Sequence, residues 1–123
     1  MGESFRDLAV GQRSIELTLA VYSLTSKFPD SERFGLINQL RRASVSVASN
    51  IAEGNGRATK GEYIQFLGHA RGSNSEAETQ IVISKALGFG THEELKTSED
   101  LCHEVGRMLG ALIKSQRPQT LVP

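Results

Sequence analysis

The absence of proline from residues 30–117 constrains this fold more than any other feature of the sequence. Proline disrupts the interior of a helix because it lacks a backbone N–H and its ring collides with the preceding turn. A proline-free segment of this length therefore favours long helices. The whole chain has 123 residues, of which 38% are hydrophobic, and a chain of this size fits one compact domain.

Helix start and stop signals divide this segment into units of similar length. Asp30 can cap a helix, and residues 59–62 and 91–94 both read Thr-x-x-Glu, which is the spacing of a capping box. Glycine pairs then follow two of the expected helices. The signals predict helices near residues 7–27, 31–54, 60–88 and 92–115. Such a series predicts an all-α, antiparallel up-down-up-down four-helix bundle over residues 1–117, followed by a flexible tail at 118–123.

The first expected helix carries apolar residues on two nearly opposite sides. One stripe consists of Leu8, Ile15, Leu19 and Tyr22, and a second stripe lies across the helix from it. A helix at the corner of a bundle faces one core, so the second stripe would be exposed in a monomer. We therefore expect it to form an interface between copies of the chain, with a folded-over terminal segment as the alternative. The expected interface residues are Val10, Leu17, Val21, Leu24 and Phe28.

Charge is unevenly distributed, although the formal net charge is zero. Residues 33–71 contain six basic and two acidic side chains, whereas residues 72–104 contain two basic and seven acidic ones. Repetition of the basic segment around a ring would concentrate positive charge and could bind phosphate groups. The alternative is that the basic and acidic segments neutralise each other. The candidate nucleic-acid-binding residues are Arg41, Arg42, Arg57, Lys60 and Arg71.

One such neutralising contact is expected between the second and third helices. If they pack antiparallel about the turn near residues 54–56, Glu76 lies within reach of Arg42 or Arg41. We therefore expect an ion pair between Glu76 and one of these arginines. Separately solvated side chains are the alternative.

The sequence offers no convincing catalytic or metal-binding pattern. Asp100-x-x-His103 only approaches the Glu-x-x-His spacing of di-iron bundles, and a second copy of that motif is not found. Cys102 is the one cysteine, so neither an internal disulfide nor a cysteine zinc site can form. We therefore predict no catalytic residues, no metal and no cofactor. The lone cysteine and the lack of a signal-like apolar segment favour a cytoplasmic protein with no membrane contact.

Several sequence blocks resemble a known family. They are Glu32-x-Phe34-Gly35-Leu36-x-x-Gln39-Leu40-Arg41-Arg42-Ala43, Ser46-Val47-x-Ser49-Asn50-Ile51-Ala52-Glu53-Gly54, Tyr63-x-x-Phe66-Leu67, Ala70-x-Gly72-Ser73-x-x-Glu76 and Ala86-Leu87-Gly88. Over residues 5–115 the chain resembles the bacterial four-helix-bundle family encoded in intervening sequences of 23S ribosomal RNA genes. That family is similar in fold to the accessory proteins of diversity-generating retroelements, which form five-subunit rings and associate with a reverse transcriptase and nucleic acid. The resemblance implies a homopentamer with a basic surface and implies no catalytic residues.

These observations predict a non-enzymatic homo-oligomer, a pentameric ring, that binds RNA or another nucleic acid through its basic surface. The alternative is a protein-interaction adaptor or scaffold that binds no nucleic acid. Binding that weakens steeply with salt would favour the first hypothesis, because phosphate contacts release counterions. Capture of a protein partner that is insensitive to salt would favour the second.

Overall fold

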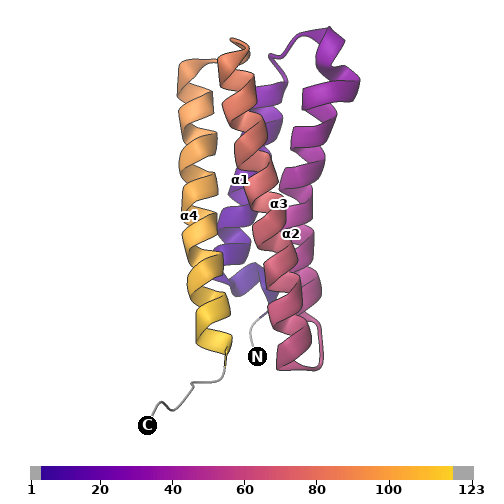
Figure 1. Cartoon of the computed structure of the whole chain (residues 1–123), viewed down its shortest axis with the longest axis vertical. Coiled ribbons are helices and arrows are strands. Elements are labelled where there is room, and N and C mark those ends of the chain that lie inside the picture. The colour runs from indigo at the N-terminus through magenta and orange to yellow at the C-terminus, as the bar shows by residue number, and fades with distance from the viewer. Residues whose placement is uncertain (1–3, 118–123) are drawn as a thin grey trace.

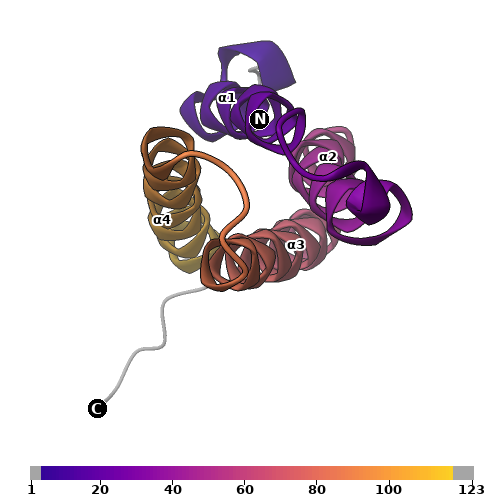
Figure 2. The ribbon, with the colours of Figure 1, turned by 90° about the horizontal axis from the view of Figure 1, so that it is seen from above.

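The computed structural model describes residues 4–117, and the elements in this range are all helical. The four long helices are α1 (Ala9–Thr25), α2 (Asn38–Asn55), α3 (Lys60–Ala86) and α4 (His92–Gln116). Neighbouring helices run antiparallel, and they surround one core with α1 diagonally opposite α3 (Figures 1 and 2). The predicted four-helix bundle is confirmed. The tail expected at residues 118–123 lies outside the described residues.

Local hydrogen bonds set the starts of α3 and α4. The hydroxyl oxygen of Thr59 accepts a hydrogen bond from the backbone N–H of Glu62 at 3.1 Å, and that of Thr91 accepts one from Glu94 at 3.2 Å. Each bond satisfies a donor in the first turn that has no partner within the helix. The two helix starts predicted from the capping-box spacing are therefore confirmed.

The entry into α2 differs from the prediction. Asp30 does not cap a long helix but begins a one-turn 3₁₀ helix, η2 (Asp30–Glu32). The irregular turn η3 (Arg33–Ile37) follows, and within it Gly35 has non-helical backbone angles of φ −105° and ψ −115°. Regular α2 begins only after this kink. The kink leaves Phe34 87% exposed, although helical periodicity assigns it to the side that faces the core.

The interior is filled by two adjoining clusters of apolar side chains, and α1 contributes to both. Its contribution is the stripe that the sequence analysis assigned to contact between copies. The residues Val10, Leu17, Val21, Leu24 and Phe28 have exposed fractions of 5% or less. The predicted interface is therefore wrong, because these side chains pack against α2, α3 and α4 of the same chain. Periodicity identifies two stripes on a helix but does not say which of them faces the core.

Polar contacts fix the levels of α1 and α3 against α2. The hydroxyl of Thr18 donates to the backbone carbonyl of Ser44 at 3.1 Å, which joins α1 to α2. The hydroxyls of Ser46 and Ser73 lie 2.9 Å apart and join α2 to α3. Because α2 runs antiparallel to both neighbours, these bonds place Thr18 at about the level of Ser73 to Ser75.

None of the helices within residues 4–117 combines the length and the hydropathy needed to span a lipid bilayer. The predicted cytoplasmic location stays a prediction.

Candidate functional site

The five candidate nucleic-acid-binding residues lie at three separate places on the bundle. Arg41 and Arg42 line a groove between α1 and α2. Arg57 and Lys60 lie where the chain turns from α2 into α3. Arg71 lines a different groove, between α3 and α4. The structure therefore does not gather these residues into one patch on a single chain.

Arg41 is held by contacts within the chain. Its Nε donates a hydrogen bond to the hydroxyl of Thr25 at 2.8 Å, and its guanidinium carbon lies 4.4 Å from the centroid of the Tyr22 ring. The residue is half-buried, which strengthens the attraction between the cation and the ring. Arg41 thus fastens α2 to α1. This role is not predictable from local sequence patterns, because Tyr22 and Thr25 are distant from Arg41 along the chain.

Arg57 is also engaged. Its Nη2 lies 2.6 Å from Glu53 Oε1, and its guanidinium carbon lies 4.6 Å from the centroid of the Phe66 ring. The remaining three candidates, Arg42, Lys60 and Arg71, are exposed. Among residues 4–117, no acidic side chain forms an ion pair with any of these three. Of the five candidates, these three are the ones available to an anionic partner.

The expected ion pair of Glu76 with Arg41 or Arg42 does not form within the described part of the chain. The register of α2 against α3 does not account for this, because the bond between Ser46 and Ser73 places Arg42 level with Ala77, the residue after Glu76. Arg41 points to α1 instead. Arg42 and Glu76 are both exposed and solvated separately.

Charge also differs between the two ends of the bundle. The turn from α2 into α3, with Lys60, lies at the same end as the C-terminal part of α4, which carries Lys114 and Arg117 (Figure 1). The start of α4 lies at the opposite end and carries Glu93 and Glu94. An anionic ligand is therefore favoured at the first end and disfavoured at the second.

A patch of exposed apolar side chains covers the outer side of α1 and the adjoining part of α2. Its members Ile15, Leu19, Tyr22 and Val45 have exposed fractions of 43%, 65%, 42% and 42%. We call these four residues the α1 patch. Tyr22 and Val45 also line the groove of about 570 Å³ that holds Arg41 and Arg42. The α1 patch thus continues into a groove with a positively charged rim.

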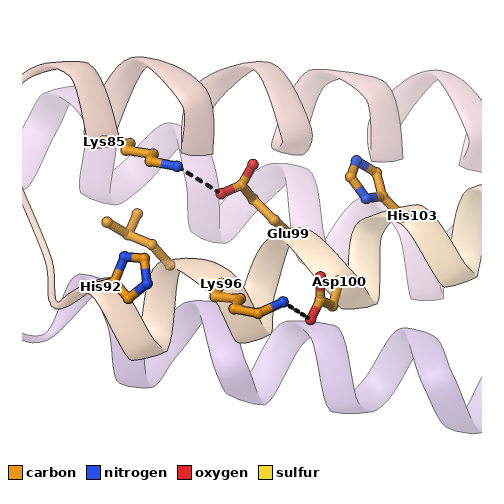
Figure 3. A pocket seen from close by; sticks show the side chains of 7 residues that line it. Lys85, His92, Lys96, Glu99, Asp100 and His103 are labelled. Atoms are coloured by element: carbon orange, nitrogen blue, oxygen red, sulfur yellow. Dashed lines mark hydrogen bonds and ion pairs between the residues drawn. The ribbon is translucent and has the colours of Figure 1, made fainter.

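A smaller hollow of about 260 Å³ lies between the end of α3 and the start of α4 (Figure 3). Lys85 Nζ lies 3.9 Å from Glu99 Oε1, and Lys96 Nζ lies 3.0 Å from Asp100 Oδ2. At the edge of the hollow, His103 Nε2 contacts Glu78 Oε2 at 2.5 Å. The charges of this hollow are mostly matched within it. Within residues 4–117, no group of three or more His, Cys, Asp or Glu side chains is placed to bind a metal ion.

Cys102 is buried in the core beside this region. Burial raises the pKa of its thiol to about 12, and the nearby carboxylates of Glu78 and Glu99 add to the rise. The thiol is therefore protonated near neutral pH. Because the thiolate is the nucleophilic form of cysteine, Cys102 acts as a packing residue.

Comparison with solved structures supports the fold. The chain is similar to a crystal structure of a protein of unknown function from the S23 ribosomal protein family of Bacteroides thetaiotaomicron, with a TM-score of 0.77. The two chains are 20% identical, and the match covers 86% of this chain and 99% of the other. A search among curated proteins gave no match. The model of the 23S rRNA-intervening sequence protein family matches residues 6–111. This match spans most of the chain, which therefore belongs to the 23S rRNA-intervening sequence protein family.

Proposed function

We propose that this protein is a non-catalytic helical bundle that works as a homo-oligomer, a ring of five copies assembled through the α1 patch. The observation that carries the proposal is the exposure of Ile15, Leu19, Tyr22 and Val45 on one continuous surface. Exposed apolar surface of this kind is typical of protein contacts, because burying it removes it from water. The number of copies rests on the family resemblance.

The remainder of the surface supports a binding role over catalysis. In the hollow between α3 and α4, the carboxylates of Glu99 and Asp100 form ion pairs with lysines. The thiol of Cys102 is buried and protonated. Nucleophilic catalysis needs an activated nucleophile beside an oriented base. These groups do not provide that arrangement.

Light scattering coupled to gel filtration tests the assembly. We expect a mass of about five times the 13.4 kDa of one chain for the parent protein. Leu19→Glu should reduce the mass to that of one chain, because it places a charge in the contact while leaving the core untouched. Phe34→Glu is the matched control, since Phe34 is also exposed but lies outside the α1 patch. A parent protein with the mass of one chain would refute the proposal.

Binding of nucleic acid is a second candidate function, favoured by the basic end of the bundle. Lys60, Lys114 and Arg117 are exposed there. If the copies stand side by side in the ring, each contributes these cations to the same rim. Such a rim would attract the phosphates of a single-stranded RNA or DNA. The alternative is that the assembled protein is a protein-interaction adaptor. Binding of a protein partner with an affinity that depends little on salt would favour this hypothesis over nucleic-acid binding.

A further inference from the structure

The α1 patch belongs to a row of residues along the outer side of α1. The spacing in this row alternates between four and three residues, which is the spacing of a helix that packs lengthwise along another helix. Four of its six members are large and apolar, and three of these, Ile15, Leu19 and Tyr22, are each more than 40% exposed. The row consists of Leu8, Gln12, Ile15, Leu19, Tyr22 and Ser26.

The outer side of α3 carries a row with the same spacing but with mostly small residues. The row consists of Gly61, Gln65, Gly68, Gly72, Ser75, Thr79, Val82 and Ala86, all of them exposed and uncharged. A Cβ atom added at Gly61, Gly68 or Gly72 would meet nothing within 4 Å, so packing inside the chain does not require glycine there. Glycine inside a helix costs roughly 1 kcal/mol relative to alanine. Small side chains let another helix approach closely.

The two rows match in direction and in level. Because the bundle runs up-down-up-down, α1 and α3 of one chain point the same way, and copies standing side by side present them in parallel. The bonds through Ser44 and Ser46 place Thr18 near the level of Ser73 to Ser75. Ile15 and Leu19 of one copy therefore lie level with the small residues of α3 in a neighbouring copy.

Charge complements this match. Arg42 and Glu76 are exposed, and neither forms an ion pair among residues 4–117. Arg42 lines the groove between α1 and α2. Glu76 lies on α3, and α2 separates α1 from α3 around the bundle (Figure 2). When two copies stand side by side with α1 of one against α3 of the other, their α2 helices lie on the same side, so these opposite charges approach each other.

We propose that the groove between α1 and α2 binds the outer side of α3 from a second copy of this chain. Leu19 and Tyr22 pack on the small residues of the incoming helix, and Arg42 pairs with the partner subunit's Glu76. This inference rests on the proposed self-assembly and names the two surfaces that it uses. The groove and the α3 row are different surfaces, so the contact is heterologous and extends to a ring or a filament. A two-fold dimer would instead use one surface twice.

Disulfide cross-linking between two single-cysteine variants tests the pairing. Both variants carry Cys102→Ser, so that the introduced thiol is the one thiol present. One variant adds Leu19→Cys, and the other adds Ser75→Cys, which lies at the level of Leu19. The two are mixed under denaturing conditions, refolded together and oxidised. We expect at least ten times more covalent dimer in the mixture than in either variant alone. Pairing Leu19→Cys with Thr97→Cys, on the exposed side of α4, is the matched control and should give no such increase.

The outcomes separate this inference from the proposed self-assembly. Cross-linking in Leu19→Cys alone, with the light-scattering mass of an oligomer, would show an α1–α1 contact and overturn the pairing while self-assembly stands. A parent protein with the mass of one chain would overturn both.

Charge reversal gives an independent check. Arg42→Glu should raise the dissociation constant of the oligomer at least tenfold, and adding Glu76→Arg should restore most of it. No recovery in the double variant would contradict the ion pair between copies.

Discussion

The guanidinium of Arg41 lies over the ring of Tyr22, 4.4 Å from its centroid, and fastens α2 to α1 at the edge of an exposed apolar patch. The same guanidinium donates a hydrogen bond to the Thr25 hydroxyl at 2.8 Å. Arg41, which the sequence predicted to bind phosphate, is thus held by contacts with Tyr22 and Thr25 of the same chain. Its neighbour Arg42 is exposed and forms no ion pair among residues 4–117, so the two adjacent arginines of α2 differ in their contacts.

The contact between Arg41 and Tyr22 should be measurable as a coupling energy. In a double-mutant cycle of Arg41→Ala and Tyr22→Ala, we expect about 0.5–1 kcal/mol of coupling, which is typical of a partly exposed cation–π pair. Urea unfolding measures it in the Leu19→Glu background, where assembly does not add to stability. The control cycle pairs Arg41→Ala with Phe34→Ala. Equal coupling in the two cycles would contradict a specific contact.

Gly54 is required by close packing of α2 on α3. A Cβ atom at this position would lie 2.8 Å from the Cβ of Phe66 and 3.3 Å from Cδ1 of Tyr63. We expect Gly54→Ala to lower the free energy of unfolding by about 1–3 kcal/mol, because the helices must move apart. Gly110→Ala is the matched control, since a Cβ there meets nothing within 4 Å. It should stabilise the protein by up to ~1 kcal/mol through helix propensity.

Cys102 should be inert in the folded protein. Because burial raises the pKa of its thiol to about 12, little thiolate is present at pH 8, and the side chain is fully covered. We expect alkylation by iodoacetamide at pH 8 to be at least 100 times slower in the folded protein than in urea. The Cys102→Ser variant gives the background rate. Rapid labelling of the native protein would contradict the burial of this thiol.

Stability should fall in acid partly because of Glu94. A hydrogen bond from the Ser23 hydroxyl, followed by contacts with Lys27 and Thr91, lowers the pKa of the Glu94 carboxyl below its ordinary value of 4.5. A carboxylate with a lowered folded-state pKa stabilises the protein above its unfolded-state pKa, and this contribution disappears as the pH falls through the folded-state value. Urea midpoints measured from pH 7 down to pH 3 should therefore fall less for Glu94→Gln than for the parent. Parallel pH profiles for the two proteins would count against this linkage.

Nucleic-acid binding, if it uses the basic end, should depend on salt and on Lys60. Fluorescence anisotropy with a labelled single-stranded RNA measures this binding. We expect the logarithm of the association constant to fall linearly with the logarithm of the salt concentration. Lys60→Glu should weaken binding and reduce the slope by about 0.7 per lost phosphate contact. Lys96→Glu at the opposite end is the control and should leave binding unchanged. Equal losses in both variants would indicate attraction by overall charge only.

The ends of the helices were predictable where the signal is local. Thr59 and Thr91 cap helices through bonds to residues three positions later, so the sequence alone locates α3 and α4. The entry to α2 was not predictable, because the kink at Gly35 breaks the helical period and turns Phe34 outwards. The separation of the five candidate nucleic-acid-binding residues into three places was also not predictable from the sequence. It depends on how α2 and α3 are rotated about their axes.

The sequence by itself determined that there are four long helices and where α3 and α4 start, because these features depend on interactions within a few residues. Only the tertiary structure decided which stripe of α1 is buried: Leu17, Val21 and Leu24 face the core, and Leu19 faces outwards. Both stripes are apolar, so burying either one removes apolar surface from water. The choice depends on packing against α2 and α4, including the bonds from Thr18 to Ser44 and from Arg41 to Thr25, which hold α1 in one rotation.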